Sequence, residues 1–171
     1  KNIIKDISAE TINIHQGDQT ININFHVNNF NDPNTAYILS QHCDAALRNG
    51  NLIEGCIQMA RLIWFNGNHP ENHSIFKTNN KNKTIQCIED GRINQYSLPS
   101  KFQKIMDVIL TVFERSEKES EKYYDLNDIF DNPDNHEKFF RQLETDLSNE
   151  LYNHKELVKQ TIAKFQHQIA N

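Results

Sequence analysis

A long apolar stripe at helical spacing fills the last third of the sequence. Apolar residues recur in steps of three and four over 140–169, and His154 fills the one gap in register. Asp134 is placed as an N-cap with Glu137 three residues on, which predicts where the helix begins. About nine helical turns are more than a small α/β unit can cover, so the pattern predicts a packing seam against another helix, in this chain or in a second copy. The seam residues expected to hold an oligomer together are Leu147, Leu151, Val158, Ile162 and Phe165.

The N-terminal segment predicts a β-hairpin. Apolar and polar residues alternate with period two from residue 11 to residue 27, and Gly17-Asp18 marks a turn between two strands. A two-stranded hairpin is marginally stable alone, and uncharged edges invite pairing, so it needs the rest of this chain or the hairpin of another copy. The hairpin residues expected at an oligomer contact are Ile12, Ile14, Ile21, Ile23, Phe25 and Val27.

The middle of the chain predicts a small α/β unit. Asn34 or Thr35 is placed to cap a helix, and Asp90-Gly91 is a turn between two strands. The elements expected here are helices over 36–47 and 52–65 and short strands over 74–78, 84–89 and 92–96.

A third helix is expected after Leu98-Pro99, with Ser100 and Gln103 spaced as a capping box. The charged run that follows, over 114–125, is typical of a solvated helical face. Together these patterns predict an α+β fold with an N-terminal hairpin arm over 1–33, a small α/β unit over 34–98 and a helical region of two long helices over 99–171.

Charge and composition exclude several classes of protein. A net charge of −5 argues against a protein that coats nucleic acid, which needs clustered Lys and Arg. No apolar run approaches 18 residues and no signal-like segment is present, so no membrane association is expected. The three cysteines are odd in number and far apart, which indicates free thiols rather than a disulfide framework. Because Lys1 is not an initiator methionine, a missing N-terminal piece is also expected.

The segment His69-Pro70-Glu71-Asn72-His73 has two interpretations. In a metal-dependent hydrolase or nuclease, His69 and His73 would be ligands and Glu71 the general base, but such a pair needs an uninterrupted helix and Pro70 disfavours one. In the interpretation we prefer, Pro70 and Asn72 shape a connection, His69 and Glu71 hydrogen-bond to backbone groups, and the segment locks the second helix to the first strand of the sheet. No catalytic residue, metal or cofactor is predicted.

A second alternative is nucleic-acid binding around the small sheet. The basic residues that would serve it are Lys77, Lys81, Lys83 and Arg92. Motifs for nucleophilic catalysis or nucleotide binding, such as G-x-S-x-G, the P-loop and G-x-G-x-x-G, are absent from the sequence.

FNGNHPENHSI at 65–75, with NNKNKTI at 79–85 and the Asp90-Gly91 turn, resembles a segment of uncharacterised proteins of mimivirus-like giant viruses, where it reads F-N-x-x-H-P-E-N-H-N-I. This chain departs from that pattern at Ser74 and at Arg92-Ile93. The resemblance covers roughly residues 20–171. It implies a virus-encoded protein of the host cytoplasm or virus factory, in which an N-terminal module can bind nucleic acid, and it carries no catalytic residues to transfer.

These patterns lead us to expect a non-enzymatic domain for homo-oligomerisation or protein interaction. Its partner would be a second copy of itself, through the hairpin and the helical seam, so that an N-terminal module is presented in several copies.

Overall fold

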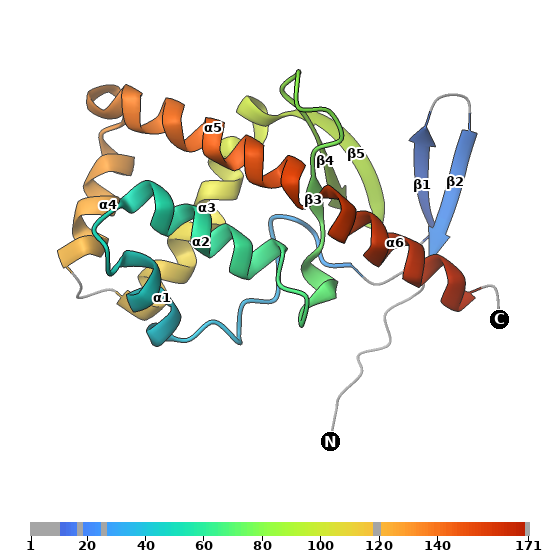
Figure 1. Cartoon of the computed structure of the whole chain (residues 1–171), viewed down its shortest axis with the longest axis horizontal. Coiled ribbons are helices and arrows are strands. Elements are labelled where there is room, and N and C mark those ends of the chain that lie inside the picture. The colour runs from blue at the N-terminus through green and yellow to red at the C-terminus, as the bar shows by residue number, and fades with distance from the viewer. Residues whose placement is uncertain (1–10, 17–18, 25–26, 118–120, 170–171) are drawn as a thin grey trace.

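The computed structural model describes residues 11–16, 19–24, 27–117 and 121–169 as an α+β fold with a long helical C-terminal half (Figure 1). The strands are β1 (Thr11–Gln16), β2 (Gln19–Asn24), β3 (Ile75–Phe76), β4 (Thr84–Glu89) and β5 (Arg92–Ser97). The α-helices are α1 (Ser40–Leu47), α2 (Leu52–Trp64), α3 (Leu98–Glu117), α4 (Glu121–Asp131), α5 (Glu137–Asn153) and α6 (Lys155–Ile169), and Pro70–Asn72 and Pro133–His136 form 3-10 turns.

Strands β3, β4 and β5 form the antiparallel sheet that the sequence predicts. Asp90 and Gly91 join β4 to β5 with positive φ angles of 50° and 69°. Two successive residues with positive φ make the type of two-residue turn that matches the twist of a hairpin, and Asp-Gly is among the sequences best suited to it. β5 is an edge strand of this sheet.

The predicted N-terminal hairpin is confirmed as an antiparallel β1–β2 pair, separate from the three-stranded sheet. Its register aligns Ile12 with Ile23 and Ile14 with Ile21. β1 lies near β5 and β2 near α6, at the end of the molecule far from α1 and α4 (Figure 1). Phe25 and the side chains of the four isoleucines lie outside the described residues, while Val27 packs on the core of its own chain.

The segment after the hairpin belongs to the core. Phe30 is fully buried, its amide donates to the Ile88 carbonyl at 3.0 Å, and its carbonyl accepts from Trp64 Nε1 at 3.0 Å. The described residues of the expected 1–33 arm are therefore divided between the β1–β2 hairpin and a strap, residues 27–34, that lies against β4 and α2.

The core joins both halves of the chain through α2. Its apolar face contacts α1 on one side and α3 and α5 on the other. A Cβ at Gly55 would lie 2.9 Å from the Ala46 carbonyl oxygen, so the close packing of α1 on α2 requires glycine at this position. All three cysteines are buried.

The expectation of one uninterrupted C-terminal helix is wrong. Pro133 begins a 3-10 turn, α5 starts only at Glu137, and Asp134 is not its N-cap. The helix breaks again at His154, where the Lys77 amide of the β3 end takes the Leu151 carbonyl as acceptor at 3.1 Å. The last carbonyls of a helix need partners outside the helix, and the Lys77 amide is such a partner for Leu151, which accounts for the break at this point.

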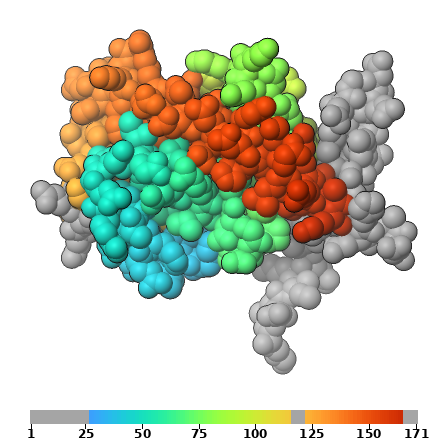
Figure 2. Space-filling model, in the orientation of Figure 1, coloured from blue at the N-terminus to red at the C-terminus, as the bar shows by residue number. Residues whose placement is uncertain are grey.

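Four of the five seam residues that the sequence assigns to an oligomer contact are instead buried within this chain. Leu147, Leu151 and Val158 are 0% exposed and Ile162 is 6% exposed within this single chain. They lie on α5, which packs against α2 and α3, and on α6, which continues beside β3; Figure 2 shows the two helices (orange to red) as one band across this face of the molecule. The side chain of Phe165, the fifth residue of that set, lies outside the described residues.

Two further sequence expectations on the helices need correction. Neither Asn34 nor Thr35 caps α1, which begins at Ser40, and Ser100 lies inside α3, where its hydroxyl donates to the Ser97 carbonyl. The charged run over 114–125 is not only a solvated face, because Tyr123 of α4, which lies within it, is buried. The described residues of the region expected to hold two long helices form four α-helices, α3 to α6.

Because Leu151 is buried within one chain, Leu151→Ala should lower the free energy of unfolding by about 2–5 kcal/mol and leave the mass in solution unchanged. Leu39→Ala, at a side chain that is 53% exposed, serves as the control and should change stability little. Chemical denaturation and light scattering measure the two quantities. A variant of unchanged stability but smaller mass would contradict the intrachain seam.

Candidate functional site

The His69–His73 segment is a 3-10 turn between α2 and β3. Pro70 occupies the first position of the turn, and the amide of His69 donates to the Asn66 carbonyl at 3.0 Å. The turn is followed at once by β3, so the segment connects α2 to the sheet as the preferred interpretation expects.

Asn72 is the centre of this segment. Its side chain is 0% exposed, and Oδ1 accepts from Asn34 N and Asn28 Nδ2, both at 2.9 Å. Its Nδ2 donates to the Asn34 carbonyl at 2.7 Å and lies 3.4 Å from the Tyr37 hydroxyl. One amide therefore pairs both backbone groups of Asn34 and holds the strap of residues 27–34 against the sheet and α2.

The side chains of His69 and Glu71 hydrogen-bond to each other, and not to backbone groups as the sequence predicts. His69 Nδ1 lies 3.0 Å from Glu71 Oε1, and the imidazole stacks on the Tyr37 ring with 3.4 Å between centroids. The stack covers one face of His69 and fixes the direction of its nitrogens.

His73 is buried and uses both ring nitrogens. Nε2 lies 3.0 Å from the Asn66 carbonyl and Nδ1 lies 2.5 Å from Thr161 Oγ1 on α6. The carbonyl can only accept, so we assign the proton to Nε2, and Nδ1 then accepts from the Thr161 hydroxyl. Burial lowers the pKa of His73, which favours this neutral form.

The metal interpretation of this segment is not supported by the geometry. The nitrogens of His73 point to Thr161 and Asn66, and His69 turns to Glu71. Within the described part of the chain, no three His, Cys, Asp or Glu side chains are arranged to hold a metal ion.

Arg61 on α2 and Glu150 on α5 form the main ion pair between the helices. Arg61 Nε and Nη2 donate to the two Glu150 oxygens at 2.9 and 2.7 Å, the two-pronged geometry of a strong pair. Arg61 lowers the pKa of Glu150 by this hydrogen bonding, and the pair raises the pKa of Arg61. His154 stacks on Phe65 beside it.

The structure brings together three of the four basic residues predicted around the sheet. Lys77, Lys81 and Lys83 line one open groove, whose opposite wall is α5. Lys77 Nζ donates to Ser148 Oγ at 2.6 Å, and Lys83 Nζ pairs with Glu144 at 3.0 Å. Arg92 starts β5, at the far end of the β4–β5 hairpin from Lys83, and does not line the groove.

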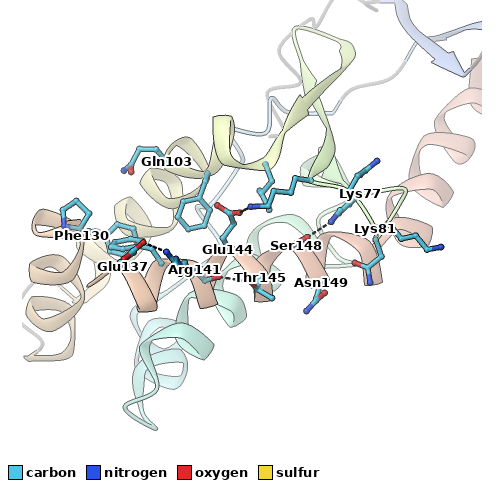
Figure 3. Close-up of a pocket in the computed structure, with 17 residues that line it drawn as sticks. Lys77, Lys81, Gln103, Phe130, Glu137, Arg141, Glu144, Thr145, Ser148 and Asn149 are labelled. Atoms are coloured by element: carbon cyan, nitrogen blue, oxygen red, sulfur yellow. Dashed lines mark hydrogen bonds and ion pairs between the residues drawn. The ribbon is translucent and has the colours of Figure 1, made fainter. Parts of the chain in front are cut away.

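The groove has a volume of about 850 Å³, within the range of small-molecule sites. It runs along α5, with Lys77 and Lys81 at one end and Phe130, Glu137 and Arg141 at the other (Figure 3). Four cationic side chains and two carboxylates line it, so its lining carries net positive charge although the chain carries −5.

Sequence reasoning missed the α5 side of this groove. Arg141, Glu144 and Ser148 recur at steps of three and four residues, as do Arg141, Thr145 and Asn149, so they share a helical face away from the apolar stripe. That polar periodicity was available in the sequence, but only the fold shows that it faces the lysines of the β3–β4 loop.

No family model, curated protein or solved structure shows a significant match to this chain. The resemblance to giant-virus proteins therefore stays a prediction. Over the residues that the structure describes, no helix is both long and apolar enough to cross a bilayer.

Asn72→Ala would leave the amide and carbonyl of Asn34 without their buried partners. We expect a loss of about 2–3 kcal/mol in the free energy of unfolding, from the desolvation of unpaired polar groups. Asn68→Ala, in the exposed part of the same connection, is the control and should cost less. Thermal and urea unfolding measure both, and equal effects of the two substitutions would contradict a central role for Asn72.

His73 should make the protein less stable as the pH falls. Its pKa is lowered from 6.5 in the folded chain, so above that pH both states are neutral, and below it the unfolded chain binds the proton first. The difference in melting temperature between about pH 7.5 and about pH 5.5 should therefore shrink in His73→Gln. His136→Gln, on the 3-10 turn before α5, should keep the wild-type difference. A wild-type pH response in His73→Gln would show that other groups carry it.

Proposed function

We propose that this chain is a non-enzymatic assembly domain that associates with copies of itself through the β1–β2 hairpin. The observation that carries the proposal is a two-stranded sheet whose strands, TINIHQ and QTININ, contain no Asp, Glu, Lys, Arg or Pro. Among the described strands, neither β1 nor β2 pairs with a third.

The physical argument concerns the outer edges of this hairpin. A strand at the edge of a sheet presents unpaired N–H and C=O groups, and proteins normally protect such edges with charge, proline or a bulge. The β1–β2 register runs through six consecutive pairs without a bulge, and the strands are uncharged. A third strand from another copy would satisfy these groups and stabilise a unit that is marginal by itself.

The body of the chain supports the hairpin as the element for assembly. Leu143, Leu147, Leu151, Val158 and Ile162 of the stripe on α5 and α6 are buried inside the chain. The large apolar side chains that the described residues leave exposed are Leu39, just before α1, and Tyr124 on α4, in separate parts of the chain. Leu39 and Tyr124 therefore do not form an exposed apolar patch that could compete with the hairpin as an interface between copies.

Self-association would give the chain a function through multivalency. Modules linked to an oligomer bind a repetitive target with an avidity above their single affinity, without any new contact. If the resemblance to giant-virus proteins holds, the module presented would be a nucleic-acid-binding one, and the residues that assemble it would lie in 11–24.

The assembly is tested by blocking the outer edges with proline. In an antiparallel hairpin with two residues between Gln16 and Gln19, alternate pairs such as Asn13 and Asn22 direct their N–H groups outward. The double variant Asn13→Pro, Asn22→Pro removes two outward donors and should reduce the mass measured by light scattering to that of one chain.

The matched control is Asn13→Ala, Asn22→Ala, which changes the same side chains, keeps both donors and should keep the oligomer. Circular dichroism checks that α-helical content is unchanged in both variants. A wild-type chain that is monomeric at high concentration, or a proline variant of undiminished mass, would overturn the proposal.

A further inference from the structure

The groove between the β3–β4 loop and α5 contains a buried cation without a carboxylate partner. Lys77 is 2% exposed, and its Nζ donates to one acceptor in the described structure, Ser148 Oγ. An ammonium group has three N–H donors, and burying one costs several kcal/mol unless it is paired. A structural lysine would be expected to have an acidic partner, whereas Lys77 retains donors for a ligand.

The groove places further positive charge near this end. Lys81 has no ion-pair partner within the described residues, and Lys83 Nζ extends from the same loop to Glu144. The loop is pinned, since the Lys81 and Thr84 amides donate to the side chains of Asn79 and Asn82, and the Lys83 carbonyl accepts from Leu98 N at the start of α3. The lysines are therefore presented on an ordered turn rather than on a free segment.

Partly exposed aromatic rings lie further along the groove. Phe102 of α3 and Phe140 of α5 meet edge to face with 6.5 Å between centroids, and Phe130 meets Phe140 at 4.9 Å. Phe102, Phe130 and Phe140 all line the groove and remain partly exposed (Figure 3). Exposed ring faces near a cluster of cations suit a ligand with an aromatic part and an anionic part.

We propose that this groove binds a nucleoside phosphate, with its phosphate at Lys77, Lys81 and Lys83 and its base against Phe102 and Phe140. The phosphate supplies the acceptors that Lys77 lacks, and charge-assisted hydrogen bonds of this kind are the strong ones. The side-chain amides of Asn80 and Asn82 line the groove on the same loop as the lysines and provide further hydrogen-bond donors and acceptors for the ligand. The nucleotide is either free or part of a single strand, which share this chemistry.

The site is independent of the hairpin that we propose for assembly. Its lining comes from 77–83, α3, the end of α4, the 3-10 turn before α5 and α5 itself. The proline variant of β1 and β2 should therefore bind the nucleotide as the wild type does, and loss of one function should leave the other.

The experiment is a titration of the whole chain by calorimetry with AMP, adenosine and inorganic phosphate as probes. AMP should bind at least tenfold more tightly than adenosine or inorganic phosphate, because its phosphate contacts the lysines while its base contacts the Phe rings. Lys77→Met should weaken AMP binding about tenfold or more, since it removes a charged donor from the phosphate. Arg92→Met removes a surface cation outside the groove and should leave the affinity within about twofold.

A stability measurement distinguishes a ligand-binding lysine from a structural one. Lys77→Met removes a buried charge that has no opposite charge, so the free chain should be as stable as the wild type or more stable, while its affinity for AMP falls. A destabilised Lys77→Met chain with wild-type affinity would overturn the proposal, as would AMP binding no tighter than inorganic phosphate.

An oligonucleotide carrying a 5′-phosphate distinguishes a single strand from a free nucleotide as the ligand. Tighter binding than AMP indicates a single strand, and equal binding indicates a free nucleotide.

Discussion

The buried amide of Asn72 is the constraint on which the rest of the structure depends. It is reached by hydrogen bonds from the strap of residues 27–34, and the next residue, His73, extends the connection to Thr161 on α6. The adjacent side chains of Asn72 and His73 thus connect the start of β3 to the strap of residues 27–34, to the end of α2 and to the last helix. Buried polar groups fix one arrangement because every alternative leaves some of them unpaired. The apolar core supplies the stability, and this polar network selects the geometry in which that core packs.

Helix α5 transmits this geometry to the groove because its two faces have different partners. Leu143, Leu147 and Leu151 pack on the core side, where Arg61 also holds Glu150. The opposite face carries Arg141 and Ser148 to the groove. Since the Leu151 carbonyl accepts from the amide of Lys77, the end of α5 and the lysine of the groove are in fixed register. A groove built from two elements that are bonded to each other holds its charges at set distances, which is what recognition of a phosphate requires.

Local sequence patterns predicted the helices and strands well, but not which elements pack against one another. The alternation over 11–24 gave the β1–β2 hairpin, and Asp90-Gly91 gave the turn before β5, because both signals lie within a few residues. The apolar stripe of the last third correctly indicated a packing seam, but a stripe carries no information on whether its partner is α2 of this chain or a second copy. The break at His154 has no local signal in the sequence, because it depends on the hydrogen bond from the Lys77 amide to the Leu151 carbonyl, and these residues are far apart in the chain. In the same way, the sequence places four basic residues around the sheet, and only the fold separates Arg92 from the three lysines of the groove.

Burying the ammonium group of Lys77 costs stability, and this cost is the physical reason for proposing a ligand site around it. Nothing in the sequence separates it from Lys81 or Lys83, yet the fold buries it and leaves the other two exposed. Burial and the charge of Lys83 lower the pKa of Lys77, so the folded chain holds this proton less firmly than the unfolded chain does. Stability should accordingly rise as the pH increases through the range between that lowered pKa and 10.5, where the folded chain gives up the proton first. An anion in the groove would act in the opposite direction, because it stabilises the charged form. A bound phosphate should therefore flatten this alkaline rise in stability, and the flattening should be lost together with the lysine in Lys77→Met.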